Sequence, residues 1–460
     1  MERQRNSSMP AALTLEQLEA DVASGLIDTV IVAITDMQGR LSGKKLQANF
    51  FLDEIVNHGT EGCNYLLAVD VDMNTVAGYE MSSWERGYGD FVMMPDMDTL
   101  RYVPWQDKTA MVLADVLWED GSDVVASPRQ ILRRQIARLT EMGMVALCGT
   151  ELEFIVFDDS YEEAWKKSYR DLTPANLYNV DYSLLGVSRI DDLLRDIRNS
   201  MAAASMYVES VKGECNLGQH EIAFRYDEAL RTCDNHVIYK LGTKEIAAKH
   251  HKAITFMAKF NEREGSSCHT HLSVRGQDGN LTMVDPNSSG TLSEFGKHFL
   301  AGQIAHMAEM TLMFAPNINS YKRFVEGSFA PTAIEWGHDN RTCALRLVGH
   351  GHGLRFENRV PGGDANPYLV VAAMIAAGLD GVENSIELPA EFVGNAYLAD
   401  TARVPSSLNE ALRLWKASDF VTRAFGEQVQ AHYANMAKVE IAAFSHAITD
   451  WERFRSFERM

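Results

Sequence analysis

The chain has 460 residues, a length that is typical of two or three domains. Hydrophobic residues make up 46% and charged residues 23%, with 32 Gly and 12 Pro, which fits an ordinary globular protein and excludes a collagen-like or largely disordered chain. The net charge of −20 argues against nucleic-acid binding as the main role, because proteins that bind phosphate backbones usually carry a basic surface.

The N-terminal part of the chain predicts a small mixed sheet preceded by one helix. The first residues, MERQRNSSMPAALT, lack the apolar core of a secretion signal. Thr14 and Gln17 form a capping-box pattern and Gly25 supplies a stop, so a helix is expected between them. β-Branched runs and turn signals predict strands at 27–35, 40–46, 65–73, 90–96, 100–105 and 109–118. We therefore expect a first domain over 1–126.

A second domain is expected over 127–460. Ser127 is placed as the N-cap of a helix that has Pro128 in its first position and Gly143 beyond its end. Polar-faced strands then alternate with helices, including a nearly all-apolar and therefore buried helix that begins after Asn366. Residues 432–460 are predicted as helix, and their aromatic side chains serve either domain packing or an intersubunit contact.

The location of the protein is predicted from cysteines and apolar runs. The six cysteines are scattered and none forms a C-x-x-C pair, which is typical of reduced thiols in a cytoplasmic protein. The longest apolar runs are shorter than the roughly 18–20 residues of a membrane helix, so no membrane association is expected.

Three predicted strands carry polar side chains on one face and apolar side chains on the other, because side chains two residues apart point the same way. The polar faces hold Glu151 and Glu153 in the first strand, His269, His271 and Ser273 in the second, and Arg355, Glu357 and Arg359 in the third. A loop segment adds Glu214 and Glu221 across a turn at Gly218.

Each of these patterns alone is typical of a solvated strand or a surface row of ion pairs. Together they predict polar faces that converge inside a barrel or cleft. Carboxylates gathered there repel one another and resist burial, an objection that a divalent cation removes. Five Glu and one His suit Mg²⁺ or Mn²⁺ better than Zn²⁺. Two such metals near arginines are typical of phosphoryl transfer.

In this order and spacing, the segments resemble those of the glutamine synthetase superfamily, in its bacterial type I-like branch. The motifs that carry the resemblance are E-x-E, E-x6-E, H-x-H, N-S-Y-K-R, N-R-x4-R, R-x-E-x-R and A-N-P-Y, between TDMQGRLSGKK and TDWERF. The resemblance implies an α+β fold with an N-terminal β-grasp domain and a catalytic domain built on an open barrel of antiparallel strands flanked by helices. It also implies a dodecamer of two six-membered rings, with sites between neighbouring subunits.

The resemblance implies a role for each polar residue. The implied ligands are Glu153, Glu214 and Glu221 for one metal, and Glu151, His269 and Glu357 for a second that faces the nucleotide. Arg323 and Gly265 are implied to hold glutamate, with Arg359 at its γ-carboxylate. The residues implied near ATP are Glu209, His271, Ser273, Arg341, Arg346 and Arg355, and Arg341 also stabilises the transferring charge. The implied reaction forms γ-glutamyl phosphate and ADP, after which an amine displaces phosphate.

Three departures from the ammonia-using members concern the acceptor. Those members carry a glutamate in a flap that closes over the site, where EGSFAPT has Phe329, with Glu326 as the alternative carboxylate. Glu80 stands where they offer an aspartate to the neighbouring subunit, and Glu264 replaces a frequent Asn beside Gly265. The departures predict a pocket for an organic amine, with Phe329, Glu80 and Glu264 around it and Glu80 as the residue that removes a proton.

The favoured acceptor is a small monoamine such as ethanolamine, an alkylamine or aniline, since a polyamine calls for several carboxylates along a channel. The alternatives are a γ-glutamylpolyamine synthetase and a glutamine synthetase that uses ammonia. An inactive structural or regulatory homologue has the least support, because every expected Glu, His and Arg is present.

Tyr397, in GNAYLAD, stands where some family members carry an adenylylated tyrosine. The residues around it differ from the context of that modification. We therefore expect an unmodified tyrosine on the surface.

Overall fold

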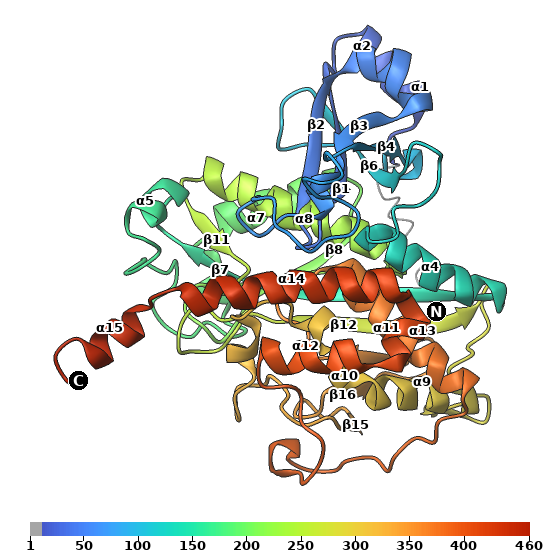
Figure 1. Ribbon diagram of the computed structural model, residues 1–460, viewed down its shortest axis with the longest axis vertical. Coiled ribbons are helices and arrows are strands. Elements are labelled where there is room, and N and C mark those ends of the chain that lie inside the picture. The colour runs from blue at the N-terminus through green and yellow to red at the C-terminus, as the bar shows by residue number, and fades with distance from the viewer. Residues whose placement is uncertain (1–11) are drawn as a thin grey trace.

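The computed structural model describes residues 12–460 and contains a small N-terminal sheet at one end of a larger, helix-flanked sheet (Figure 1). The prediction about a secretion signal falls mostly on residues 1–11, which lie outside the described residues. Within 12–460, no helix combines the length and the apolar character that a membrane crossing requires. The helices are α1 (Leu15–Ala23), α2 (Ala48–Phe50), α3 (Val56–His58), α4 (Pro128–Glu141), α5 (Tyr161–Lys166), α6 (Leu184–Ser188), α7 (Asp191–Ala203), α8 (Ala229–Lys249), α9 (Glu294–Ala305), α10 (Met307–Phe314), α11 (Pro367–Glu383), α12 (Leu408–Ala417), α13 (Asp419–Phe425), α14 (Glu427–His446) and α15 (Asp450–Ser456).

The first sheet has six strands in the order β2-β1-β6-β4-β3, with β5 beside β6. Its strands are β1 (Thr29–Thr35), β2 (Leu41–Gln47), β3 (Thr60–Cys63), β4 (Asp90–Pro95), β5 (Arg101–Tyr102) and β6 (Thr109–Leu117). β1 and β2 form an antiparallel hairpin, while β1 runs parallel to β6. The capping box of Thr14 with Gln17 starts α1 as predicted, and Gly25 follows its end with φ of 76°.

The strand predicted over 65–73 is wrong. The chain forms a 3₁₀ turn over Asn64–Leu67 and then bends, with a bridge between Val69 and Thr75. The Asp70 carboxylate accepts a hydrogen bond from the Asn74 backbone N–H at 2.8 Å. Such local bonding offers the backbone an alternative to a sheet ladder, which the apolar pattern alone did not reveal.

The second sheet has nine strands and carries the polar faces. Its central path is β15-β16-β17-β12-β7-β9-β8, with β10 and β11 paired to β7. The strands are β7 (Met144–Phe157), β8 (Val208–Gly213), β9 (Gln219–Phe224), β10 (Asp227–Glu228), β11 (Ala253–Thr255), β12 (Cys268–Gly276), β15 (Trp336–His338), β16 (Leu345–Val348) and β17 (Arg355–Asn358). Neighbouring strands are antiparallel except β15 and β16, which run parallel. A separate two-stranded ribbon joins β13 (Val284–Asp285) to β14 (Ser288–Leu292).

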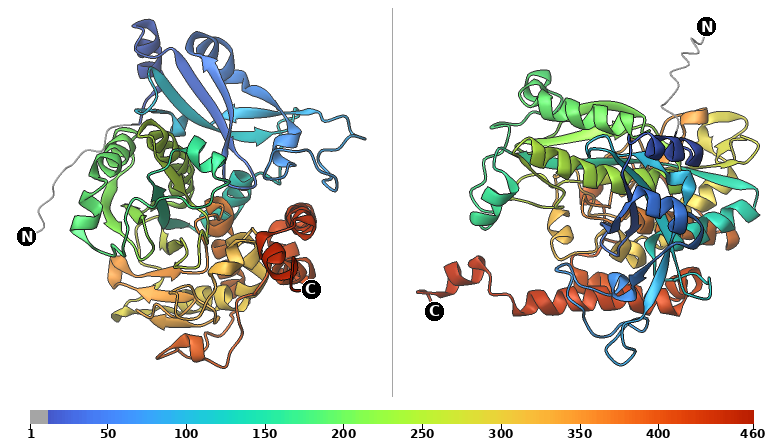
Figure 2. Two further views of the ribbon diagram at one scale, coloured as in Figure 1. Left: turned by 90° about the vertical axis from the view of Figure 1, so that its left-hand side faces the viewer. Right: turned by 90° about the horizontal axis from the view of Figure 1, so that it is seen from above.

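The two sheets share one buried apolar cluster, although the left-hand view in Figure 2 shows the N-terminal sheet standing away from most of the molecule. Ile31 and Met111 from the first sheet belong to the same buried cluster as Leu152 and Phe154 from β7. Leu152 and Phe154 are the apolar partners predicted opposite the two glutamates. On the other side of the large sheet, α11 is buried throughout 367–381 and packs against α9 and α4.

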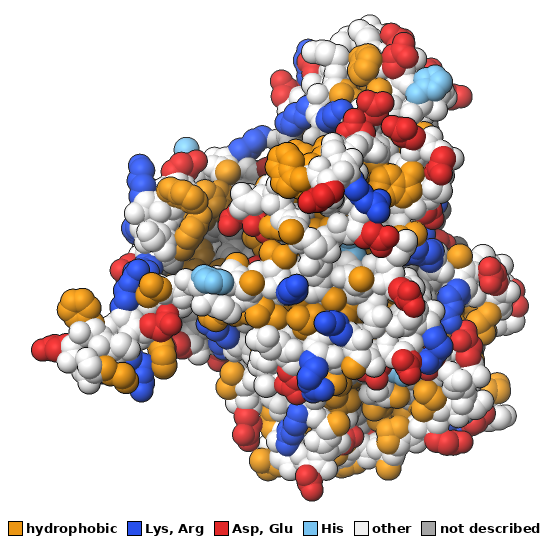
Figure 3. Space-filling model, viewed as in Figure 1, with side chains coloured by type: hydrophobic (Ala, Val, Ile, Leu, Met, Phe, Trp, Pro, Cys, Tyr) orange, Lys and Arg blue, Asp and Glu red, His pale blue; other side chains and the backbone are white. Residues whose placement is uncertain are grey.

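The single helix predicted over 432–460 is also wrong, because the chain breaks between α14 and α15. Thr449 starts α15 through a capping box with Glu452. This short helix projects from the body of the molecule (Figure 1), with the exposed Trp451 and Phe454 on it and the exposed Phe457 directly after its end. The projecting arm and its orange side chains are visible in Figure 3.

Arg129 in α4 joins the first sheet to helix α8 through a buried cluster of charges. Its guanidinium donates to Asp234 in α8 at 2.9 and 3.0 Å, to Asp96 at 2.7 Å and to Asp115 in β6. Tyr368 in α11 donates to the same Asp234 at 2.6 Å. Ser127 precedes α4 as predicted, but its side chain makes no capping hydrogen bond, so Pro128 is the residue that favours the helix start.

We predict that Arg129→Met lowers the free energy of unfolding by about 3–5 kcal/mol, because it leaves three carboxylates without their shared cation. Arg133→Met is the control, since Arg133 contacts Asp96 and Asp115 from a side chain that is 42% exposed. The control should lose about 1 kcal/mol or less. Urea unfolding at one protein concentration measures both, and equal losses would contradict the prediction.

Candidate active site

A cavity of about 260 Å³ lies along the polar face of the second sheet. It gathers most of the residues predicted for metal, glutamate and acceptor. The predicted residues that line it are Glu151, Glu153, Glu214, Glu221, Glu264, Gly265, His269, Arg323, Phe329, Arg341, Arg346, Glu357 and Arg359. A cavity of about 280 Å³ shares Glu151 with it and is lined by Glu209, His271, Ser273 and Arg355, the other residues predicted near ATP.

Glu80 is the predicted site residue that the chain does not bring to either cavity. It is exposed and lines a separate cavity with Trp118 and His432, between the N-terminal sheet and α14. Within one chain, Glu80 therefore cannot act on a substrate bound at the polar sheet face.

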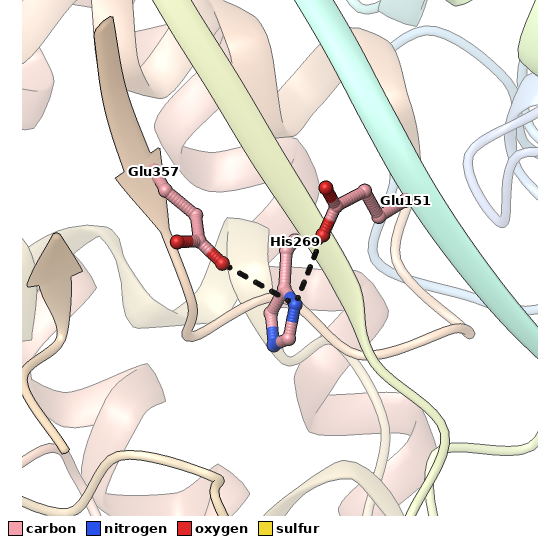
Figure 4. Close-up of side chains that lie close together, drawn as sticks. All are labelled: Glu151, His269 and Glu357. Atoms are coloured by element: carbon pink, nitrogen blue, oxygen red, sulfur yellow. Dashed lines mark ion pairs between the residues drawn. The ribbon is translucent and has the colours of Figure 1, made fainter. Parts of the chain in front are cut away.

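Glu151, His269 and Glu357 come from three neighbouring strands, β7, β12 and β17, and point toward one another (Figure 4). His269 Nδ1 lies 3.5 Å from Glu151 Oε2 and 3.5 Å from Glu357 Oε1. Burial alone would raise the pKa of Glu151, but contacts with His269 and His271 hold it well below its usual range. The arrangement keeps Glu151 ionised in the absence of any bound ion.

Glu153, Glu214 and Glu221 form a second group beside the first. Glu153 and Glu221 are direct cross-strand partners in β7 and β9. The Glu153 carboxylate accepts from the Ser267 backbone N–H at 2.8 Å and from the Ser267 hydroxyl at 2.6 Å, which fixes its orientation. Burial, together with the nearby charges of Glu151 and Glu153, raises the pKa of Glu221 to about 8.

Both groups fit a divalent cation. Each offers three ligand atoms that lie within 4.8 Å of one another. Bonds of about 2.0–2.6 Å from one ion can span donors at that separation, and the mostly oxygen donors suit a hard ion. The raised pKa of Glu221 is the clearest indication that this group requires a cation. A buried carboxylate beside other carboxylates is stabilised most by a nearby positive charge.

Lys212 is a charged residue at this site that the sequence interpretation missed. Its ammonium contacts the Glu214 carboxylate and lies 3.7 Å from Glu221 Oε1, and it also faces the Tyr182 ring at 5.1 Å. A signal was available, since Lys212 precedes Glu214 by two residues at the end of β8 and therefore shares its face. Lys212 supplies part of the positive charge that the three glutamates require.

Arg323 is buried at the cavity with unused hydrogen-bonding capacity. Its side chain is 2% exposed, and Nη2 donates to the carbonyls of Arg359, Val360 and Pro361 at 2.7–3.1 Å. Within residues 12–460, Nε and Nη1 of Arg323 find no acceptor. Burial lowers the pKa of Arg323 to about 10, so it stays charged at neutral pH. A carboxylate ligand would satisfy both nitrogens.

Gly265 lies directly against Arg323. A Cβ atom at this position would stand 2.4 Å from the Ala258 carbonyl oxygen and 2.6 Å from Arg323 Cγ. Glycine is therefore required for the backbone to approach the arginine.

Two arginines neutralise Glu357. Arg359 Nη1 and Arg346 Nη1 both contact its carboxylate, the latter at 2.9 Å. Burial opposes ionisation of Glu357, but His269 and Arg359 lower its pKa below the usual value. Arg341 is exposed at the rim of the same cavity. The cavity thus combines a carboxylate-rich side with an arginine-rich side, as a site for anionic substrates and divalent ions requires.

Residues 324–330, which we call the flap, also line the cavity through Ser328, Phe329 and Ala330. Phe329 has φ of 59°, a left-handed conformation that is uncommon for an aromatic residue, and its side chain is 56% exposed. Arg359 Nη2 donates to the Phe329 carbonyl at 3.4 Å. Tyr397 is buried, not on the surface as predicted, because its hydroxyl turns inward and donates to the Ala330 carbonyl at 3.1 Å.

Asp181 and Cys215 are two further lining residues that the sequence interpretation missed. Ligand atoms of Asp181, Glu214 and Cys215 lie within 4.8 Å of one another. Burial and then the Asp181 charge raise the pKa of Cys215 to about 11, so it is a neutral thiol. Asp181 lies in an irregular loop shaped by an Asn179 side chain that accepts from its N–H at 2.8 Å, a placement without sequence periodicity.

Comparison with known proteins agrees with this geometry. Residues 125–456 match the model of the glutamine synthetase catalytic domain. The chain is 63% identical to a γ-glutamylethanolamide synthetase of Streptomyces coelicolor, over 97% of this chain and 96% of that protein. It is 38% identical to a glutamate–isopropylamine ligase of a Pseudomonas species, over 93% and 95% of the two chains. The solved structure of a GmaS–ADP complex is 27% identical, with a TM-score of 0.84 over 96% of this chain and 99% of that one.

We predict that Glu221→Gln stabilises the metal-free protein by on the order of 1–3 kcal/mol near pH 8, because it removes the buried charge. A carboxyl group whose pKa is raised to about 8 in the folded state loses stability as pH rises from about 5 to 8, so the advantage of the variant should grow over that range.

The same variant should show a smaller rise in melting temperature with Mg²⁺ or Mn²⁺ than the parent protein, because one of the two candidate ion sites loses a ligand. Glu209→Gln, which changes an exposed carboxylate in the other cavity, is the control and should keep the rise of the parent. Thermal unfolding with and without metal measures both effects. A metal-free Glu221→Gln protein that is less stable than the parent at every pH would refute the prediction.

Proposed function

The chain belongs to the glutamine synthetase family, and we propose that it joins the γ-carboxylate of glutamate to a small organic monoamine. It is a carbon–nitrogen ligase that uses ATP and proceeds through γ-glutamyl phosphate. The observation that carries the choice of acceptor is Phe329, which lines the cavity where ammonia-using members place a carboxylate.

In the first step, a γ-carboxylate oxygen of glutamate attacks the γ-phosphorus of ATP, and the bond from that phosphorus to ADP breaks. Arg323 and Gly265 would hold the amino-acid end of glutamate, since Arg323 has two buried nitrogens free for a carboxylate. Arg359 would face the γ-carboxylate. Arg341 and Arg346 would stabilise the negative charge that moves between the two substrates.

The remaining predicted residues would hold the nucleotide and the ions. Glu209, His271, Ser273 and Arg355 line the adjoining cavity that we assign to ATP. Glu151, His269 and Glu357 would bind one Mg²⁺ or Mn²⁺ ion, and Glu153, Glu214 and Glu221 would bind another. Such ions, when bound, neutralise phosphate oxygens and polarise the transferred group.

In the second step, the amine nitrogen attacks the γ-carbonyl carbon and phosphate leaves with the electron pair of the carbon–oxygen bond. The amine arrives largely protonated, so one proton must leave before attack and a second as the amide forms. Asp181 and Glu264 both line the cavity and would bind the ammonium group. Cys215 cannot serve as the base, because its thiol stays neutral.

A small monoamine is favoured over a polyamine and over ammonia. The names of the two ligase relatives specify ethanolamine and isopropylamine, which are both small monoamines. Since identity to the first is 63%, we propose ethanolamine as the acceptor. The Phe329 ring would contact its carbon atoms, and two carboxylates are enough for a single ammonium group.

We also propose a dodecamer of two stacked six-membered rings. In such an assembly, Glu80 would serve as a catalytic base in a neighbouring subunit's site, and the exposed aromatic side chains of α15 would be covered.

We propose two domains, a β-grasp domain over 1–126 and a catalytic domain over 127–460. The end of β6 at Leu117 and the start of α4 at Pro128 support this division. Six unpaired cysteines and the use of ATP support a cytoplasmic location.

A panel of amines tests the proposed function. With glutamate and ATP, ethanolamine should support ADP release with kcat/KM at least about tenfold higher than ammonium or putrescine. Mass detection of the γ-glutamyl amide identifies the product. Turnover with ammonium but with no organic amine would refute the proposal.

We predict that Phe329→Glu raises kcat/KM for ammonium by about 10- to 100-fold, because a carboxylate at the flap provides a charged hydrogen-bond acceptor for the small cation. The same change should lower kcat/KM for ethanolamine. Phe329→Leu is the matched control, since it keeps an apolar side chain and should give no gain with ammonium. The role of the flap is refuted if both variants respond to ammonium equally.

A further inference from the structure

A segment far along the chain, residues 391–404, lies beside two parts of the active site at once. On one side it bonds to the chain that follows the flap: the Ile334 N–H donates to the Ala402 carbonyl at 2.9 Å and the Val404 N–H to the Thr332 carbonyl at 3.1 Å. On its other side, the Ala396 N–H donates to the Thr342 hydroxyl at 2.9 Å. We call residues 391–404 the bracket.

The bracket also holds the loop that carries Arg341. Asn340, which directly precedes Arg341, donates from its side-chain amide to the Gly394 carbonyl at 2.9 Å. Ala333, Cys343, Ala396 and Ala399 form a small buried apolar cluster between the flap side and the loop side. The bracket therefore fixes the flap and the Arg341 loop relative to each other.

Tyr397 is the side chain through which the bracket reaches the flap itself. Its hydroxyl donates to the carbonyl of Ala330, the residue after Phe329, and the side chain is buried. Arg403 stabilises the backbone of the tyrosine, since Arg403 Nη1 donates to the Tyr397 carbonyl at 3.1 Å. A short 3₁₀ turn over Ala396–Leu398, capped by the Asn395 side chain, sets the direction of the ring.

The hydrogen bond to Ala330 acts where the flap is strained. Phe329 has a positive φ, which costs an aromatic residue energy and persists only where the surrounding structure holds it. Two contacts hold it: Arg359 on the Phe329 carbonyl and Tyr397 on the next carbonyl. Loss of the second contact would leave the Arg359 bond in place but would weaken the hold on Phe329 and let its ring shift along the cavity wall.

We propose that Tyr397 is a positioning residue for acceptor selection, which acts by fixing Phe329 against the acceptor side of the cavity. The proposal rests on the proposed function for its kinetic consequence, but the tether itself does not depend on which amine is used. It also assigns the buried hydroxyl of Tyr397 to a structural hydrogen bond in place of a surface role.

The test uses Tyr397→Phe, which removes only the hydroxyl, in the full-length protein. Tyr433→Phe is the matched control, because Tyr433 is also buried and donates from its hydroxyl to a backbone carbonyl, that of Ala126, at 2.9 Å, at a place that lines neither cavity. Thermal unfolding checks that both variants fold. Backbone hydrogen exchange over 324–330 is measured without substrates, and KM is measured for amine, glutamate and ATP.

Tyr397→Phe should exchange about 3- to 10-fold faster over 324–330, the factor expected for one lost hydrogen bond. KM for the organic amine should rise by a similar factor, with KM for glutamate and ATP within about twofold of the parent. Tyr433→Phe should change neither. Unchanged exchange in Tyr397→Phe, or an equal rise in KM for all three substrates, would overturn the proposal.

The two proposals fail in different ways. If the parent protein uses no organic amine, the proposed function is wrong, and the exchange measurement alone decides whether Tyr397 holds the flap. If amines are used but exchange and amine KM are the same in parent and Tyr397→Phe, the ligase assignment stands and the role of Tyr397 is refuted.

Discussion

Repulsion among carboxylates that share one cavity is the constraint on which the rest of this structure depends. The repulsion is offset differently in the two halves of the cavity, one around Glu357 and the other around Glu221. Around Glu357, Arg346 and Arg359 supply positive charge, and contacts with His269 and Arg359 lower the pKa of that carboxyl despite burial. Around Glu221, Lys212 is the one cation in ion-pair distance among residues 12–460, and the pKa of that carboxyl is raised to about 8. The second half is therefore the part whose charge balance depends most on an added cation.

This constraint explains why the site is built on strands. A strand can hold a carboxylate on its polar face while the next residue anchors it in the core, as Glu151 and Glu153 alternate with the buried Leu152 and Phe154. Antiparallel pairing then places Glu153 directly opposite Glu221 and His269 opposite Glu151. The backbone ladder thus holds together side chains that would otherwise move apart.

Most of this arrangement was predictable, because alternation along strands is a strong local signal. It placed the two glutamates of β7, the histidines of β12, and Arg355 of β17 with the following Arg359 on the faces that line the two cavities. The acceptor side was less predictable. Asp181 lies in an irregular loop, and the inward turn of Tyr397 depends on contacts with a segment more than sixty residues away, which no local pattern encodes. The strand predicted over 65–73 was wrong for a related reason. The hydrogen bond that the Asp70 carboxylate accepts from Asn74 favours a turn, although the apolar pattern predicts a strand.

The shared core between the two sheets has a consequence for how such proteins can diversify. β1 and β6 bury residues against β7, and Arg129 draws carboxylates from both sides of the boundary into one cluster. A chimera that took its first 126 residues from a distant relative would have to bring residues equivalent to Ile31, Met111, Asp96 and Asp115. Recombination at this boundary is therefore constrained by packing and charge, whereas the flap around Phe329 can change a residue at a time. The proposed role of Phe329 therefore favours local substitution in the flap over exchange of the N-terminal segment as the route to a new acceptor.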